Sequence, residues 1–183
     1  MYNIGDNIVY GMSGVMTIVD IKNVNLTGEA KDYYLLCDYG RSGSSVTYVP
    51  MDNPQLMENM HRLLTPDEVK DAIAEARRLC DVEWIPDSRQ RSEAYRRQRS
   101  EAYRRIMRSA RRSEILAMIR TVHNTGLSRA AIGKKNFLAD EGVMQKAEGV
   151  IITEFAISLG IPEEDVRRII DREIKGIPDA PSV

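Results

Sequence analysis

Short runs rich in β-branched and aromatic residues cover the first 64 residues of the chain, with no helical period between them. Glycine, asparagine and proline bound these runs, and such residues form turns or stop strands. A segment of about 60 residues can bury one modest core in this way. The pattern therefore predicts four or five short strands in a small curled sheet or partly open barrel, with runs at residues 7–10, 15–21, 33–39 and 46–49.

At Thr65 the pattern changes to helical spacing. Thr65 is a good N-cap, Pro66 suits the first helical position, and Glu68 is placed for a capping box. Apolar residues then recur every three or four positions, which predicts a bundle of about five helices. We expect one helix to begin after an N-cap at Ser113 and to end near 124–126. A second helix is expected from about 134 to 159, and a last helix from Pro162 to Lys175-Gly176.

These patterns predict an α+β protein with two domains, a small curled β sheet or partly open barrel (1–64) and an all-α bundle (65–176), followed by a flexible tail (177–183). The bundle core is predicted from the apolar spacing. Its expected members are Val69, Ile73, Ala76, Leu79 or Cys80, Ile115, Leu116, Met118, Ile119, Val122, Phe137, Leu138, Met144, Ile151, Ile152, Phe155, Val166, Ile169, Ile170 and Ile174.

One stretch concentrates positive charge. Residues 89–112 contain ten arginines, no lysine and two glutamates, for a formal charge of +8. The whole chain carries −1, so the remainder sums to −9. Guanidinium groups pair bidentately with phosphate oxygens, and the only tryptophan, Trp84, lies just upstream. An indole beside an arginine cluster suits a nucleic-acid contact. The alternative is a solvated charged helix with Trp84 in the core.

The stretch also contains a tandem repeat: RQRSEAYR at 89–96 recurs unchanged at 97–104. Eight residues turn an α-helix about 80° beyond two full turns, so the copies cannot share one face. The second copy either lengthens a basic helix or forms an extruded loop. If the basic stretch is helical, its apolar stripe is expected to contain Tyr95, Ala102, Ile106 and Ala110.

The remaining composition favours no other chemistry. No apolar run approaches the roughly 20 residues of a membrane span, and the N-terminus lacks an export signal. The two cysteines, Cys37 and Cys80, and the two histidines show no metal-ligand spacing, so we expect buried, reduced thiols, no metal and no cofactor. The sequence contains no glycine-rich phosphate-binding loop, and no set of a nucleophile, a base and an orienting group can be assembled from it. The chain is therefore predicted not to be an enzyme and to have no small-molecule substrate.

Several motifs together resemble the CarD/CdnL family of bacterial transcription regulators, whose N-terminal half is related to the polymerase-interacting domain of the transcription-repair coupling factor. The resemblance covers nearly the whole chain. The matching segments are 4–10 with Gly14-Val15, 31–35, Tyr48-Val49-Pro50, 63–69, Trp84 with the basic residues after it, and Glu154-Phe155-Ala156 before Leu159-Gly160.

The resemblance implies a cytoplasmic protein, monomeric when free, whose β domain is a small Tudor-like or SH3-like barrel that binds the β subunit of RNA polymerase. Its helical domain would contact promoter DNA, duplex or forked, at the upstream edge of the melted bubble, where the family tryptophan wedges into the minor groove and slows bubble collapse. Two residue sets follow. The DNA-contacting candidates are Trp84, Arg89, Arg91, Arg96 and Arg97, and the polymerase-contacting candidates are Lys22, Arg41, Thr47, Tyr48, Val49 and Pro50.

The sequence departs from the family pattern in two places. Some members carry arginines on the polymerase-facing strands where this chain has Val24 and Tyr48. The spacing from Trp84 to Ile115 is about one repeat longer, which makes the second RQRSEAYR an insertion. Two further functions stay open: an adaptor whose arginine helix binds an acidic surface, and an RNA-binding protein that stacks bases on Trp84, Tyr95 and Tyr103.

Overall fold

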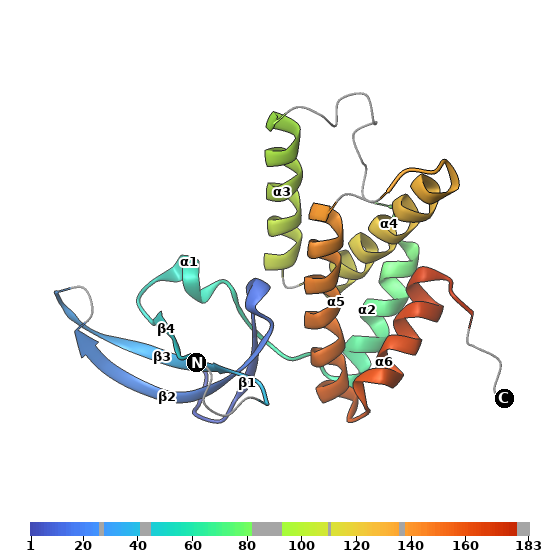
Figure 1. The fold of residues 1–183 in the computed structure, drawn as a ribbon. Coiled ribbons are helices and arrows are strands. Elements are labelled where there is room, and N and C mark those ends of the chain that lie inside the picture. The colour runs from blue at the N-terminus through green and yellow to red at the C-terminus, as the bar shows by residue number, and fades with distance from the viewer. Residues whose placement is uncertain (26–27, 41–44, 82–92, 110, 136–137, 179–183) are drawn as a thin grey trace. The chain divides into compact units, whose positions relative to one another are not determined.

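The computed structural model describes residues 1–25, 28–40, 45–81, 93–109, 111–135 and 138–178, and every structural statement below concerns these residues. The chain divides into two compact units, Met1–Leu63 and Leu64–Val183. The first contains the sheet and the second contains a set of helices (Figure 1). This arrangement confirms the predicted α+β class with strands first and helices second.

Five antiparallel strands form one sheet in the first unit, in the order β4-β3-β2-β1-β5. The strands at the two edges, β4 and β5, do not pair with each other among the described residues, so the sheet is open. A Tudor-like barrel therefore stays a prediction. The strands are β1 (Asn7–Tyr10), β2 (Val15–Asn25), β3 (Ala30–Asp38), β4 (Thr47–Pro50) and β5 (Met60–Arg62).

One face of this sheet carries the core of the β unit. Alternate strand positions point to the same face, so Tyr34 and Leu36 on β3 share it with Val49 on β4. Burying each large apolar side chain stabilises the fold by about 1.5–3 kcal/mol. The buried cluster consists of Ile8, Met16, Ile18, Tyr34, Leu36, Val49 and Met60.

A short helix, α1 (Pro54–Met57), covers part of this core and was absent from the sequence prediction. The Asn53 side chain caps it by accepting the Leu56 N–H at 3.2 Å. Leu56 and Met57 pack against the core cluster. Four residues are too few to show a helical period, which explains why the pattern missed this turn.

The second unit contains five α-helices among its described residues: α2 (Pro66–Arg78), α3 (Glu93–Arg108), α4 (Arg112–Ala131), α5 (Leu138–Leu159) and α6 (Glu163–Ile170). A π-helical turn, η3 (Asp171–Lys175), follows. The predicted capping box at the start of α2 is confirmed. Thr65 N–H donates to Glu68 Oε2 at 2.8 Å, and Glu68 N–H donates to Thr65 Oγ1 at 3.3 Å.

The central helix of this unit is α4, which contacts α2, α3, α5 and η3. It buries residues around most of its circumference over its first three turns, as a helix surrounded by neighbours must. The predicted core is largely confirmed, whereas Ile73, Leu79, Met144 and Ile169 are half-buried and Phe137 and the Leu138 side chain lie outside the described residues. The buried members include Ile115, Leu116, Met118, Ile119, Val122, Ile151, Ile152, Phe155, Val166, Ile170 and Ile174. The expectation of buried cysteines is wrong, because Cys37 is half-buried and Cys80, just after the end of α2, is exposed.

Two predicted boundaries of α4 are wrong. Arg111, not Ser113, is the N-cap residue, and Ser113 is buried inside the first turn. The helix also continues past 124–126 to Ala131. Hydroxyl groups of Thr121 and Thr125 donate to carbonyl oxygens one turn earlier, both at 2.8 Å, so these polar side chains are satisfied within the helix instead of ending it.

Candidate functional site

The strand that carries most of the predicted polymerase-contacting residues is β4. In the β3–β4 register Tyr34 lies opposite Val49 and Leu35 lies opposite Tyr48. Val49 is fully buried in the core, so its side chain is unavailable to a partner. Tyr48 lies on the opposite face of the sheet and is 43% exposed. Alternation along β4 thus divides the predicted set between two faces of the sheet.

A tyrosine pair marks the face on which Tyr48 lies. The rings of Tyr33 and Tyr48 meet edge to face, with centroids 6.2 Å apart at an interplanar angle of 73°. Tyr33 lies opposite Lys22 on one side and opposite Pro50 on the other. We call Lys22, Tyr33, Tyr48 and Pro50 the tyrosine face. It unites three of the predicted residues with Tyr33, which the predicted set omitted although strand alternation would have found it.

Lys22 on this face is held by an ion pair with Asp20 at 3.0 Å. The hydrogen bond from Lys22, followed by one from the Ile21 N–H, lowers the pKa of Asp20. The same hydrogen bond with Asp20 raises the pKa of Lys22. Both groups are therefore charged at neutral pH, and the tyrosine face presents aromatic, cationic and anionic groups side by side. Thr47 is half-buried on the core side of β4, and Arg41 lies outside the described residues.

The second predicted site lies along α3. The second copy of the repeat, 97–104, is helical throughout and lies inside α3 (Glu93–Arg108). The duplication therefore lengthens a helix. Trp84, Arg89 and Arg91 lie outside the described residues, and Arg96 is described only by its helical backbone. Arg97 is exposed on α3.

The two sides of α3 differ in chemistry. Tyr103 and Met107 are buried, at 3% and 2% exposure, and they define the side that packs inward. Ala102 and Ile106, from the predicted stripe, are half-buried, while Tyr95 and Ala110 have no described side chains. Arg104, Arg105 and Arg108 are exposed, and with Glu101 and Ser109 they line an open hollow of about 540 Å³. Tyr103 is therefore a packing residue and cannot stack on a base.

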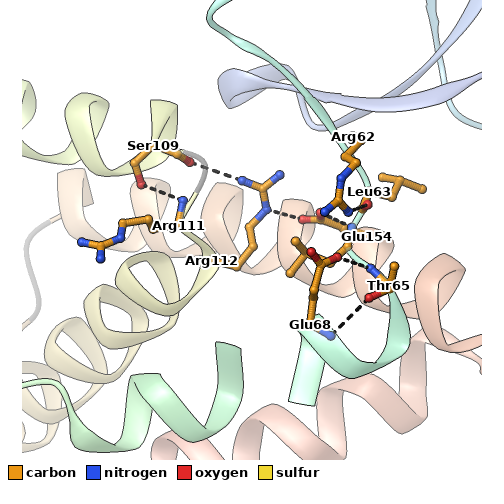
Figure 2. A network of polar contacts seen from close by, with 9 residues as sticks. Arg62, Leu63, Thr65, Glu68, Ser109, Arg111, Arg112 and Glu154 are labelled. Atoms are coloured by element: carbon orange, nitrogen blue, oxygen red, sulfur yellow. Dashed lines mark hydrogen bonds and ion pairs between the residues drawn. The ribbon is translucent and has the colours of Figure 1, made fainter. Parts of the chain in front are cut away.

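One arginine of the basic stretch has a structural role. Arg112 is buried at the start of α4, and its Nε donates to Oε2 of Glu154 on α5 at 2.5 Å (Figure 2). Its Nη1 donates to the carbonyl oxygen of Ser109 at 3.3 Å, and the Leu64 N–H donates to the other Glu154 oxygen at 3.3 Å. This network joins the C-terminal end of α3 to α5 and to the start of the helical unit. Arg112 is therefore removed from the set of possible phosphate ligands.

Arg120 on α4 fixes the point where the chain leaves α2. Its Nη1 and Nη2 donate to the carbonyl oxygens of Ala76 and Leu79 at 2.7 and 2.6 Å. Its Nε donates to Asp81 Oδ1 at 2.8 Å. Trp84 follows Asp81 by three residues in the sequence.

The described residues contain no group of three or more histidine, cysteine, aspartate or glutamate side chains placed to hold a metal ion. None of the helices in the described part of the chain is long and apolar enough to cross a membrane.

Residues 2–63 match the family described as the CarD-like/TRCF RID domain. The match coincides with the β unit, which is therefore a CarD-like domain, as the sequence motifs indicated, and the helical unit lies outside the match. A domain of this family indicates a transcription-related protein that binds RNA polymerase. A search of curated proteins found no match to the chain.

Proposed function

We propose that this chain is a non-enzymatic transcription regulator that acts in the cytoplasm on promoter-bound RNA polymerase. Its β unit binds the polymerase β subunit, and its helical unit contacts promoter DNA at the upstream edge of the melted bubble, where it stabilises the open complex. The observation that carries this proposal is the CarD-like/TRCF RID domain at residues 2–63, which is joined in one chain to a helix of exposed arginines.

The tyrosine face is the proposed polymerase contact. Tyrosine is enriched at protein interfaces because its ring buries a large area while its hydroxyl keeps a polar partner. The neighbouring Lys22–Asp20 ion pair offers both charges to a polar rim. Tyr48 combines high exposure with support from the buried Tyr33 ring, so it can enter a partner surface without first being ordered.

The proposed DNA contact combines Trp84 with the arginines that follow it. An apolar wedge at a base step partly unstacks the duplex and stabilises its distorted form. A change of about 1.4 kcal/mol in the barrier to bubble collapse alters the open-complex lifetime about tenfold. The charge outside residues 89–112 is −9, which disfavours indiscriminate DNA binding, so polymerase docking would place the cationic helix at the promoter.

The experiment that tests this proposal measures open-complex lifetime after a competitor is added, together with binding to polymerase. Trp84→Ala is expected to shorten the lifetime about tenfold while polymerase binding is unchanged, and Trp84→Phe should retain part of the effect because it keeps an apolar wedge. Equal lifetimes for the wild-type protein and Trp84→Ala would refute the wedge.

A capture experiment tests the polymerase contact separately. Tagged wild-type protein is expected to retain RNA polymerase from a cell extract, through its β subunit. If another protein is captured and polymerase is absent from the bound fraction, the chain is an adaptor and the proposal fails.

A further inference from the structure

The exposed arginines of α3 form a straight row. An α-helix turns 100° and rises 1.5 Å per residue, so Arg97, Arg104 and Arg108 project within about 40° of one another and span about 16 Å along the axis. Arg105 and Glu101 lie on the adjoining strip of the same side. Tyr103 and Met107 project from the other side and are buried, so packing leaves the arginine row exposed.

The C-terminal end of α3, which carries the end of this row, is held by packing and by a hydrogen bond. Tyr103 and Met107 anchor the last turns of α3. Directly after the helix, the Ser109 carbonyl oxygen accepts a hydrogen bond from the buried Arg112 at 3.3 Å. Arg104, Arg105 and Arg108 therefore project from a helix whose C-terminal end is held in place, which reduces the entropy lost when they bind a ligand.

Helix stability alone accounts poorly for three arginines at this place. Cations near a helix C-terminus are favourable by about 0.3–1 kcal/mol, which suits Arg108. However, the like charges of Arg104 and Arg108 are four residues apart, an arrangement that costs about 0.2–0.5 kcal/mol in an isolated helix. Within the described part of the chain, neither Arg104 nor Arg105 forms an ion pair. A bound anion would relieve the repulsion and accept hydrogen bonds from the Arg104 and Arg105 guanidinium groups.

We propose that Arg104, Arg105 and Arg108 form a second phosphate-binding site, which holds the backbone of duplex DNA beyond the segment that contains Trp84. This inference rests on the proposed function and extends it, because none of these three arginines belongs to the contacts implied by the family resemblance. The tandem copy places Arg104 about 12 Å farther along the helix than Arg96, its equivalent in the first copy, and Arg105 follows the second copy as Arg97 follows the first. The duplication thereby lengthens the DNA footprint.

The geometry favours duplex DNA over single-stranded RNA. Proteins that bind single strands combine a basic groove with aromatic side chains on which bases stack. The only aromatic residue of α3 with a described side chain is Tyr103, which is buried. The hollow offers three guanidinium groups, Glu101 and Ser109, and no ring. A rigid row of charge without a stacking surface fits the phosphates of a duplex, which also form a rigid array.

The test is a salt titration of the full chain with a fluorescein-labelled duplex, with single-stranded RNA of equal length as a second probe. The triple variant Arg104→Gln, Arg105→Gln, Arg108→Gln should bind the duplex more weakly, and its log–log salt slope should be smaller in magnitude by about 2.7, or about 0.9 per lost phosphate contact. The matched control, Arg78→Gln, Arg167→Gln, Arg168→Gln, removes the same charge from exposed positions on α2 and α6 and should keep the wild-type slope. Circular dichroism checks that both variants remain helical.

Three outcomes would overturn the site: a wild-type slope in the triple variant, an equal loss in the control variant, or a loss confined to the RNA probe. The proposed function can fail separately. If polymerase is not captured while the triple variant still loses its salt slope, the phosphate site stands and the promoter role fails. If polymerase is captured and Trp84→Ala shortens the open-complex lifetime, but the triple variant keeps the wild-type slope, only this site fails.

Discussion

Arg112 at the start of α4 and Glu154 on α5 form a buried ion pair, with 2.5 Å between Nε and Oε2 and exposures of 3% and 0%. Removing one partner from such a pair leaves an uncompensated charge in a low-dielectric interior. The pair also holds Ser109 and Leu64 by hydrogen bonds, so it connects the end of the arginine helix to the body of its unit.

We expect Glu154→Gln to lower the free energy of unfolding by about 3–5 kcal/mol, because Arg112 would remain buried without its counter-charge. Urea denaturation of the full chain measures this loss. The matched control is Glu114→Gln, which breaks the exposed pair with Arg111 and should cost at most about 1 kcal/mol. A loss of the same size in both variants would show that the buried pair has no special role.

Tyr48→Ala is expected to weaken binding to the polymerase β subunit at least tenfold, or about 1.4 kcal/mol, because it removes the exposed ring of the tyrosine face. The measurement is the Kd for a purified polymerase β fragment. Tyr39→Ala is the control, since Tyr39 has a similar exposure of 42% but follows the end of β3. Equal weakening by both variants would argue against a contact centred on Tyr48.

Arg120→Gln is expected to shorten the open-complex lifetime without weakening polymerase binding, because it releases the end of α2 that precedes Trp84. It should also cost about 1–3 kcal/mol of stability through the lost bonds to Ala76 and Leu79. Arg129→Gln, which removes a similar bond to the Lys135 carbonyl, should cost stability but leave the lifetime unchanged. A further lifetime loss when Arg120→Gln is added to Trp84→Ala would show that Arg120 does not act through Trp84.

His123 predicts a dependence of stability on pH. Burial, followed by the nearby positive charge of Lys175, lowers its pKa below 6.5, while Asp171 and Glu148 oppose this shift. Lys175 stays charged: burial alone would lower its pKa, but the hydrogen bonds that it donates to Glu148 and Asp171 outweigh burial and raise the pKa. The unfolded chain therefore binds a proton at His123 more readily than the folded protein does.

The contribution of His123 to the free energy of unfolding is therefore fully present above pH 6.5. It falls as the pH drops through that value toward the lower pKa of the folded state. His123→Gln should reduce the difference in urea midpoint between about pH 7.5 and about pH 5. An unchanged difference in His123→Gln would refute this assignment.

Local pattern along the chain determined the order of strands and helices, the capping box at Thr65 and most of the buried apolar residues. These features depend on neighbours within a few positions, where the periods of 2 and 3.6 residues act directly. The same reasoning missed α1 and ended α4 too early. A four-residue helix shows no period, and Thr121 and Thr125 satisfy their hydroxyl groups within the helix.

Tertiary structure decided which members of each candidate site can act. The sequence placed Tyr48 and Val49 together, but strand alternation exposes the first and buries the second. It counted Arg112 among the ten arginines of a basic stretch, but a carboxylate 42 residues away holds it in the interior. Charge is a property of the residue, whereas its availability to a partner depends on contacts between distant segments, and only the folded chain determines those contacts.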